Sequence, residues 1–366
     1  MKLSVTQDNL SKALSNISRV ASAKNELTIL NNILLRTDSN RLLIAATNLE
    51  IASTQYIGTK IEKPGSITVP SRLITDFVSS LPSGTVELEV KGDHLHIVSG
   101  KFSSVINGMV ADEFPELPSV NEETAVSFEF SAEDLKKAVS QTAIASSSDT
   151  TRPVLTGVLW QVYEGELYLV ATDGYRLAER RLGKAEGDMS AIIPTTTLHE
   201  VVRSMTDNNE NVVIFFDETQ VGFKTADLEI VSRLIDGKFP DYRQLIPKNN
   251  ETEIEINKND FSRIAKISNL FARESGGGIK IVASKENSLV SIHSIASELG
   301  ENTSEATAKV TNDGEVTINS RYLLEVLGVI QGDELTFAFS GKLAPCVLKE
   351  KTRSPDYTYI IMPMKS

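Results

Sequence analysis

The segment VATDGYRLA, residues 170–178, is the part of the sequence that decides the fold. The apolar and aromatic residues just before it favour a strand, and Asp173-Gly174 is a dipeptide typical of tight hairpin turns. The segment therefore predicts a strand, a turn and a second strand. A similar segment, LIAATNLEIA at residues 43–52, has its turn 125 residues earlier.

A spacing of about 125 residues recurs along the whole chain. The predicted helix positions Leu10, Leu135 and Phe261 are 125 and 126 residues apart, and Phe114-Pro115 corresponds to Phe239-Pro240. Similarity at a fixed period indicates structural repeats. We therefore expect the 366 residues to form three copies of one unit, with domains at residues 1–120, 127–247 and 252–366.

Each predicted unit contains two amphipathic helices and about eight short strands. Apolar residues recur at helical spacing in six segments. These segments are residues 7–22, 71–81, 132–146, 195–206, 258–274 and 320–330. Two helices cannot cover both faces of so many strands, so each unit is expected to be two small antiparallel sheets with both helices on one side. The predicted fold class is α+β.

The composition excludes several classes of protein. A single cysteine, Cys346, leaves neither a disulfide framework nor a cysteine-based zinc site. No apolar run is long enough for a signal peptide or a membrane span, so we expect a cytoplasmic protein with no membrane partner. The net charge of −12, taken alone, argues against a nucleic-acid partner.

The sequence contains no recognisable catalytic set. None of the Gly-Lys pairs is followed by Ser or Thr, which excludes a phosphate-binding loop. The four histidines are scattered, and His94 and His96 alone rarely make a metal site. We therefore expect a protein that is not an enzyme and has no cofactor and no metal. Two alternatives remain: a β-rich enzyme with unrecognised carboxylate chemistry, and a repeat scaffold or adhesion protein that does not bind DNA.

Basic residues are concentrated in the predicted helices. These segments hold 11 basic and 8 acidic side chains, so they are net positive. The rest of the chain is therefore more negative than the net charge of −12 for the whole chain. Lys12, Lys137 and Arg263 each stand two residues after the first apolar anchor of their repeat, about 200° around the helix from the core. Two interpretations are possible. These residues either lie on ordinary solvated faces of separate helices, or they belong to one mildly positive surface that the helices of all three repeats share.

Head-to-tail repeats could make that surface the inside of a ring. Three similar units form an arc that closes when the rotation allows. Six helices about 10 Å apart would leave an opening of roughly 9 Å, narrower than a DNA major groove of about 12 Å. Twelve helices from two chains would leave roughly 28 Å by the same spacing, which is wide enough for a duplex.

Over its whole length the sequence resembles the bacterial DNA polymerase III β subunit family, the sliding clamps. The resemblance rests on ATDGYRLA at residues 171–178, GKFPDYRQLIP at 237–247 and IIMPMKS at 360–366. It implies the DNA-clamp fold and a head-to-tail homodimeric ring that encircles double-stranded DNA without base-specific contacts. It also implies a groove for a short linear motif. The implied partners are the DNA polymerase III catalytic subunit, the clamp loader, other polymerases and repair proteins.

The charge pattern and the resemblance together predict three sets of site residues. The predicted DNA contacts are Lys12, Arg19, Lys24, Arg72, Lys137, Arg152, Arg203, Arg263 and Arg321. The predicted peptide groove is formed by Leu155, Thr172, Gly174, Tyr175, Arg176, Leu177, Pro240, Leu245, Asn319, Tyr322, Cys346, Ile360, Ile361, Met362, Pro363 and Met364. The predicted dimer contact joins residues 102–110 to residues 267–271, and its apolar centre is Ile106, Leu270 and Phe271.

One side chain has a specific predicted role, and two groups of residues have an alternative interpretation. Arg176 is expected to give the groove a polar rim. The alternative for Met362 and Met364 is that a final strand packs them into its own core. The alternative for the three dimer residues is simple membership of the core.

Overall fold

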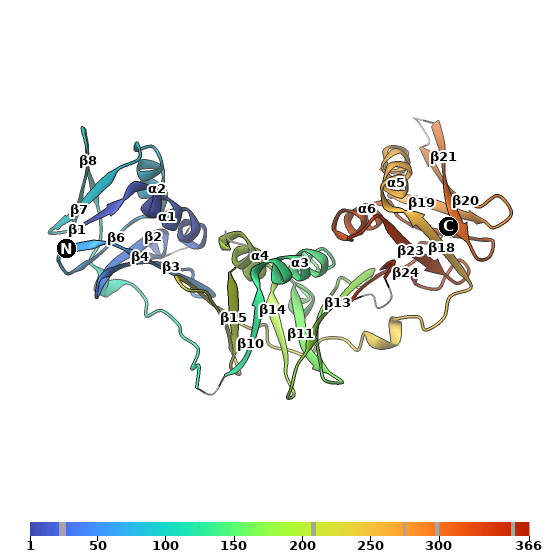
Figure 1. The fold of residues 1–366 in the computed structure, drawn as a ribbon, viewed down its shortest axis with the longest axis horizontal. Helices are drawn as coiled ribbons and strands as arrows, with labels where there is room; N and C mark the ends of the chain where they lie inside the picture. Colours follow the sequence, from blue (N-terminus) through green and yellow to red (C-terminus); the bar gives the residue numbers. More distant parts are fainter. Residues whose placement is uncertain are drawn as a thin grey trace. The chain divides into compact units, whose positions relative to one another are not determined.

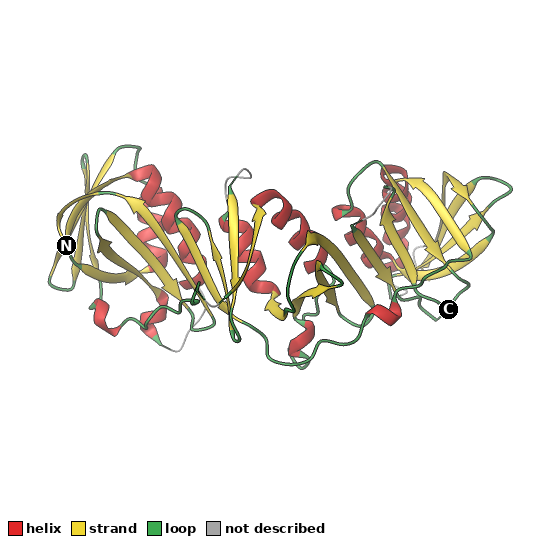
Figure 2. Cartoon of the chain, turned by 60° about the horizontal axis from the view of Figure 1, so that its bottom comes forward, coloured by secondary structure: helices red, strands yellow, loops and turns green. Residues whose placement is uncertain are grey.

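The computed structural model describes residues 1–21, 27–123, 125–205, 210–273, 276–296, 300–352 and 356–365 (Figure 1). The chain divides into two compact units. Unit one comprises residues 1–135 and 196–234, and unit two comprises residues 136–195 and 235–366. Each unit consists of antiparallel sheets with helices, which confirms the predicted α+β class (Figure 2).

Unit one contains a sheet of five strands in the order β5-β1-β7-β8-β9. Its strands are β1 (Lys2–Thr6), β5 (Lys60–Lys63), β7 (Thr85–Lys91), β8 (His94–Ser99) and β9 (Phe102–Asn107). Alternate residues of β7 and β8 are buried, as the alternation of apolar and polar residues at positions 86–90 predicts. Strand β9 lies at one end of this sheet, so one of its edges is open to pairing.

A second sheet of unit one has eight strands in the order β10-β15-β16-β17-β4-β3-β2-β6. The strands from the first repeat are β2 (Asn32–Asp38), β3 (Arg41–Thr47), β4 (Ile51–Gly58) and β6 (Ser66–Pro70). Those from the second repeat are β10 (Val126–Ser131), β15 (Asn211–Phe216), β16 (Gln220–Lys224) and β17 (Leu228–Arg233). The two sets join where β17 pairs with β4, with Ile230 opposite Ser53.

Unit two contains a sheet of twelve strands in the order β14-β11-β12-β13-β25-β24-β23-β18-β21-β20-β19-β22. The strands from the second repeat are β11 (Gly157–Tyr163), β12 (Glu166–Thr172), β13 (Arg176–Lys184) and β14 (Ser190–Pro194). Those from the third repeat are β18 (Thr252–Asn257), β19 (Gly278–Ser284), β20 (Leu289–Ala296), β21 (Gly300–Val310), β22 (Gly314–Asn319), β23 (Glu334–Phe339), β24 (Cys346–Glu350) and β25 (Tyr357–Ile361). The join is the pairing of β13 with β25, where Ala178 lies opposite Tyr359.

The sheets are antiparallel as predicted, but they are not confined to single repeats. Two of the sheets run from one repeat into the next. The physical reason is that β17 and β25, the last strands of the second and third repeats, have unpaired backbone groups, and pairing with β4 and β13 of the preceding repeat satisfies them.

All six predicted helices are present in the part of the chain that the structure describes. They are α1 (Gln7–Ala21), α2 (Ser71–Ser79), α3 (Ala132–Ala143), α4 (Thr195–Ser204), α5 (Lys258–Ala272) and α6 (Ser320–Val329). Short 3-10 helices are η1 (Thr28–Asn31), η2 (Ala111–Glu113), η3 (Pro153–Leu155) and η4 (Arg243–Leu245). Each α-helix begins where predicted and ends one to three residues early, since final turns fray or tighten.

The helices pack on the strands through the predicted apolar stripes. In unit one, α1 lies beside α2 and against β3 and β4, and it buries Leu10, Leu14 and Ile17. In unit two, α5 lies beside α6 and against β20 and β21, and it buries Phe261 and Ile264. Burying such side chains contributes about 1.5–3 kcal/mol each, which holds the helices on the sheets.

The two hairpins identified in the sequence have the same hydrogen bonds 125 residues apart. The Thr172 hydroxyl donates to the Arg176 carbonyl oxygen at 2.6 Å, and the Gly174 amide donates back to the Thr172 hydroxyl at 3.1 Å. In the first repeat the Thr47 hydroxyl donates to the Ile51 carbonyl oxygen at 3.0 Å. Gly174 has φ +93° and Leu49, at the equivalent position, has φ +75°, so both turns use the left-handed region. The predicted strand, turn and strand are confirmed.

Candidate functional site

The tip of the second hairpin meets the C-terminal segment that follows β25. The Met362 amide donates to the Tyr175 carbonyl oxygen at 2.8 Å. Two residues later the Met364 amide donates to the Thr317 carbonyl oxygen of β22, also at 2.8 Å. Residues 362–364 are therefore fixed between a turn of the second repeat and a strand of the third, and all three are half-buried. They lie outside β25, which ends at Ile361. The alternative, in which a final strand buries the two methionines in its own core, is therefore wrong.

The predicted groove residues separate into an exposed group and a buried group. Tyr175 is 64% exposed and Leu245 is 45% exposed. Also accessible are Gly174, Pro240, Asn319, Tyr322, Met362, Pro363 and Met364. The buried members are Leu155, Thr172, Arg176, Leu177, Cys346, Ile360 and Ile361. Most of the apolar surface that a ligand could touch thus comes from the first group.

Three of the buried members pack together, and we refer to the buried members as the floor of the predicted groove. Leu155, Leu177 and Ile360 belong to one apolar cluster with Phe239 and Tyr242. Burial raises the pKa of the Cys346 thiol to about 12, so the thiol stays neutral and acts as a small apolar group. These residues give the floor its shape and stiffness.

Arg176 does not form a polar rim, so that prediction is wrong. Its side chain is only 7% exposed, and its guanidinium pairs with Asp173 at 2.9 Å and with Glu325 of α6. The guanidinium also lies 4.4 Å from the centre of the Tyr322 ring. Burial alone would lower the pKa of Arg176, but Tyr359, Glu325 and Asp173 raise it overall, so the side chain is charged. Arg176 ties the hairpin to α6 and β25.

A cluster around Arg243 holds the segment that carries Pro240 and Leu245. The Arg243 guanidinium lies 3.7 Å from the ring centre of Tyr163, 4.8 Å from that of Tyr168 and 5.1 Å from that of Tyr242. It also pairs with Glu179 of β13 at 3.6 Å. Cation–π contacts of this kind contribute about 0.5–2 kcal/mol each. This cluster could not be predicted from the sequence, because Tyr163, Tyr168 and Glu179 are far from Arg243 along the chain.

The basic residues predicted to contact DNA are mostly exposed on helices. Lys12 and Arg19 are exposed on α1. The exposed fractions of the side chains are 97% for Arg72, 61% for Arg203, 69% for Arg263, 77% for Arg321 and 49% for Arg152. Lys137 on α3 is half-buried rather than pointing straight into solvent, and Lys24 lies outside the described residues.

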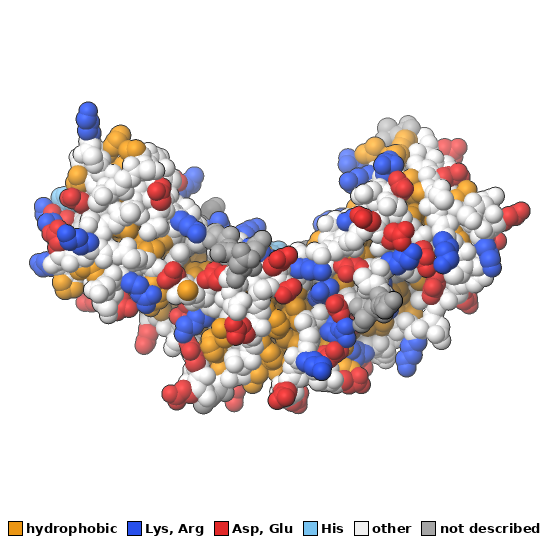
Figure 3. Space-filling view, viewed as in Figure 1, with side chains coloured by type: hydrophobic (Ala, Val, Ile, Leu, Met, Phe, Trp, Pro, Cys, Tyr) orange, Lys and Arg blue, Asp and Glu red, His pale blue; other side chains and the backbone are white. Residues whose placement is uncertain are grey.

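Most of these arginines have an acidic neighbour on the same element. The side-chain pairs are Arg72 with Asp76 at 3.9 Å, Arg152 with Asp149 at 3.3 Å, Arg203 with Glu200 at 3.0 Å, Arg263 with Asp260 at 3.0 Å and Arg321 with Glu325 at 2.7 Å. Exposed pairs of this kind contribute only about 0–1 kcal/mol, so a phosphate can compete for the arginine. Figure 3 shows basic and acidic side chains interspersed on the face that it presents. The local positive field is mild.

Of the three residues predicted for the dimer contact, one is exposed, one is half-buried and one is buried. Leu270 on α5 is 55% exposed and Phe271 is half-buried. Ile106 is only 2% exposed, so it belongs to the core of the five-stranded sheet and is wrong as an accessible contact. Its neighbour Val105 points to the opposite face of β9 and is 55% exposed, and Phe102, at the start of the strand, is 52% exposed.

The described residues contain no candidate metal centre. Nowhere in these ranges do three or more His, Cys, Asp or Glu side chains gather in a way that could hold a metal ion. No described helix is long and apolar enough to cross a membrane.

Three family models of the DNA polymerase III beta subunit match the chain. The N-terminal domain model matches residues 1–118, the central domain model residues 129–241 and the C-terminal domain model residues 243–365. The Beta sliding clamp of Bacillus subtilis (strain 168) is 33% identical over 95% of this chain and 96% of its own length. That of Staphylococcus epidermidis (strain ATCC 12228 / FDA PCI 1200) is 31% identical over 100% of both chains.

Solved structures show the same similarity. The crystal structure of the DNA polymerase sliding clamp from Bacillus subtilis has a TM-score of 0.94 and 30% identity, covering 100% of this chain and 99% of that one. The Pseudomonas aeruginosa sliding clamp bound to griselimycin has a TM-score of 0.94 and 26% identity, with 100% of both chains covered.

Proposed function

We propose that this chain, which belongs to the DNA polymerase III beta subunit family, acts as a DNA sliding clamp that encircles double-stranded DNA without reading its sequence. It is a non-catalytic subunit that gives a replicative DNA polymerase its processivity. The observation that carries this function is the match of the entire chain, in sequence and in fold, to beta sliding clamps. The domain boundaries proposed for its three repeats are residues 1–120, 127–247 and 252–366.

The proposed clamp is a ring of two chains joined head to tail. A heterologous contact closes into a ring when the rotation allows, and two copies of a three-repeat arc suffice. The proposed contact joins β9, which exposes Phe102 and Val105, to α5, which exposes Ile267 and Leu270. Support comes from the open edge of β9 and from the apolar side chains on both surfaces.

The proposed DNA contacts are weak and directed at the phosphates. Exposed basic side chains on the helices, among them Lys12, Arg72, Arg263 and Arg321, can reach a backbone without reading bases. The acidic neighbours of the arginines compete with the phosphates, so no single contact is strong. A ring held by topology and touched by weak contacts can slide.

The proposed partner site is the groove of unit two. Tyr175, Leu245 and Met364 offer accessible apolar surface above the buried floor, and methionine adapts to different ligands. A short linear motif of the DNA polymerase III catalytic subunit, the clamp loader, other polymerases and repair proteins is the proposed ligand. The proposed location is the cytoplasm.

Retention on circular DNA tests the encircling mechanism. Once loaded by the cell's own loader, the clamp should co-elute with nicked circular DNA and should be lost when the circle is linearised, because a ring slides off an end. The mass from light scattering should correspond to two chains of 40.0 kDa. Equal retention on circular and linear DNA would contradict encirclement.

A further inference from the structure

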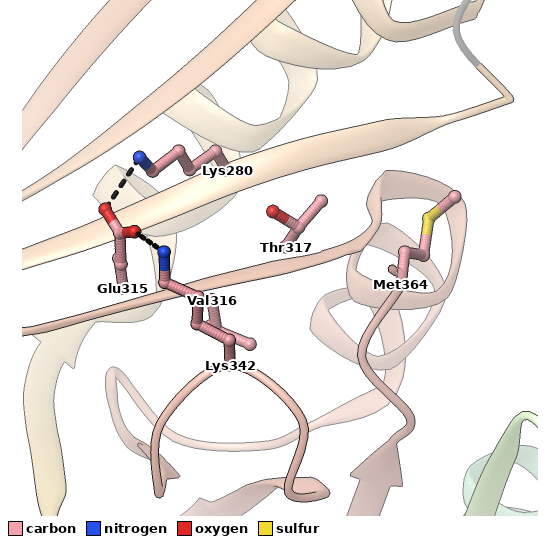
Figure 4. Close-up of a pocket in the computed structure, with 6 residues that line it drawn as sticks. All are labelled: Lys280, Glu315, Val316, Thr317, Lys342 and Met364. Carbon is pink, nitrogen blue, oxygen red and sulfur yellow. Dashed lines mark ion pairs between the residues drawn. The ribbon is translucent and has the colours of Figure 1, made fainter. Parts of the chain in front are cut away.

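A small pocket shares one residue, Met364, with the proposed groove (Figure 4). Its volume is about 80 Å³, and it is lined by Lys280, Glu315, Val316, Thr317, Lys342 and Met364. Lys280 comes from β19, and Glu315 and Thr317 come from β22. Lys342 comes from the loop after β23. None of the residues other than Met364 belongs to the groove described above.

The pocket holds two cations and one anion. The Lys280 ammonium lies 2.6 Å from one carboxylate oxygen of Glu315, and the Lys342 ammonium lies 2.5 Å from the other. Hydrogen bonds from Lys280 and Lys342 lower the pKa of Glu315 to about 2, so the carboxylate is ionised at neutral pH. One positive charge in the pocket therefore has no local counterpart among its lining residues.

The lysines also keep a side open to solvent. The exposed fractions of the side chains are 47% for Lys280, 65% for Lys342 and 33% for Glu315. An ammonium group has three donors, and one carboxylate oxygen uses one of them. Each lysine can thus bind a second carboxylate while it stays paired with Glu315.

The pocket continues the surface of the groove along one strand. Glu315, Thr317 and Asn319 alternate along β22, so their side chains lie on the same face. Lys280 lies opposite Thr317 in the strand pair. Because Asn319 and Met364 are groove residues and the Met364 amide is bonded to Thr317, a peptide leaving the groove past Met364 reaches the lysines directly.

We propose that the pocket of Lys280, Glu315 and Lys342 binds an acidic side chain that flanks the linear motif of a peptide docked in the groove. This inference rests on the proposed function of the groove. The recognised chemistry is a carboxylate of Asp or Glu, held between two ammonium groups at the end of an apolar site. A peptide is favoured over a DNA phosphate because the pocket shares Met364 with the groove and lies on strands, whereas the proposed DNA contacts lie mainly on helices.

Peptide binding to the full-length clamp tests the proposal. The probes are the clamp-binding peptide of the replicative polymerase from the same cell, the same peptide with two glutamates added at either end, and versions with two glutamines in their place. Fluorescence anisotropy at low salt should show one glutamate version binding about three to ten times more tightly than its glutamine match, since exposed ion pairs contribute modestly. The gain should shrink as salt is added.

Substitutions of the lysines test whether the pocket causes the tighter binding of the glutamate peptide. In the variant Lys280→Ala/Lys342→Ala the glutamate and glutamine versions should bind equally. Lys309→Ala is the matched control, because it removes an exposed lysine that pairs with Glu255 outside the pocket, and it should keep the full gain. Glu315→Gln removes the competing anion and should enlarge the gain at least twofold.

The outcomes separate this inference from the function on which it rests. If no version of the peptide binds, the groove itself is contradicted. If the unmodified peptide binds but the glutamates give no gain, or the gain survives the double lysine substitution, the pocket is not an acid subsite. If the double substitution weakens retention on circular DNA and leaves the glutamate gain intact, the lysines contact DNA instead and the proposal is overturned.

Discussion

The two hairpin tips, residues 47–51 in unit one and residues 172–176 in unit two, share a backbone and differ in chemistry. At each tip one carbonyl oxygen accepts a hydrogen bond from an incoming segment: Glu50 from the Arg233 amide at 3.0 Å, and Tyr175 from the Met362 amide at 2.8 Å. The side chains of Glu50 and Arg233 form an exposed ion pair at 3.9 Å. Tyr175 and Met362 are aromatic and apolar instead. Both units thus contain the same backbone hydrogen bond, which we call the joint, between a hairpin tip and an incoming segment. Only in unit two are the side chains at this joint aromatic and apolar, as the proposed groove requires.

A second difference lies one residue further along each hairpin. Ile51 is an apolar residue that is 8% exposed, whereas Arg176 is a buried cation with two carboxylate partners. At this position unit one has a packed apolar side chain, and unit two has a buried ionic network. A buried charge is tolerated only while its partners remain, so unit two should be far more sensitive to a single substitution here.

Arg176→Ala should therefore give the largest loss of stability. Removing the guanidinium takes away the buried cation that Asp173 and Glu325 share and leaves Glu325 only its exposed pair with Arg321, and breaking a buried pair costs about 3–5 kcal/mol. Urea unfolding of unit two can be followed by the fluorescence of Trp160, the one tryptophan of the chain, which is buried in β11. Ile51→Val in unit one should cost only about 0.5–1.5 kcal/mol. Equal losses would mean that the ionic network is dispensable.

Converting the unit-two tip to the chemistry of unit one should abolish peptide binding. The double variant Tyr175→Glu/Met362→Arg places charges where the proposed groove needs apolar contact, and we expect an affinity loss of about 100-fold or more. Isothermal titration calorimetry with the polymerase peptide measures it. Glu50→Gln/Arg233→Gln is the matched control at the equivalent joint and should bind the peptide normally. Unchanged affinity in the first variant would place the groove elsewhere.

Arg243→Ala should have an intermediate effect that is confined to unit two. Loss of the cation from its three tyrosines should lower the free energy of unfolding by about 1–2 kcal/mol. Because the same segment carries Leu245, peptide affinity should fall roughly fivefold. In the first repeat the equivalent segment packs Phe114 and Leu117 on an apolar cluster that Tyr56 joins, and there the Arg41 guanidinium lies over one ring only, 4.5 Å from the centre of Tyr56. A stability loss without any loss of affinity would show that the cluster does not position Leu245.

Charge reversal on the helices should have the smallest effect, and the effect should be alike in both units. Lys12→Glu in unit one and Arg263→Glu in unit two each remove one proposed phosphate contact. Each should lower the slope of log affinity against log salt by about 1. Binding is measured on short duplex DNA at several salt concentrations. Lys60→Glu on strand β5 is an exposed control and should leave the slope unchanged. A slope that neither Lys12→Glu nor Arg263→Glu changes would remove the helices from the DNA contact.

Much of the fold was predictable because its signals are local. The apolar stripes give the helices α1 to α6 their starts, and Asp173-Gly174 gives the hairpin its turn. The repeats are visible because each copy must meet the same packing demands at the same spacing. Of the candidate site, the accessible residues Tyr175, Leu245 and Met364 were predicted through the resemblance to sliding clamps.

The remainder depended on contacts between distant segments. The burial of Arg176 depends on Glu325, the burial of Ile106 depends on which face of β9 turns inward, and the position of Arg243 depends on three tyrosines. The sequence by itself determined the repeats, the helices and the turns, since hydrogen bonds and periodicity within one segment suffice for them. Only the tertiary structure decided how strands join across repeats and which charges are buried, because those depend on which open edges and opposite charges meet in space.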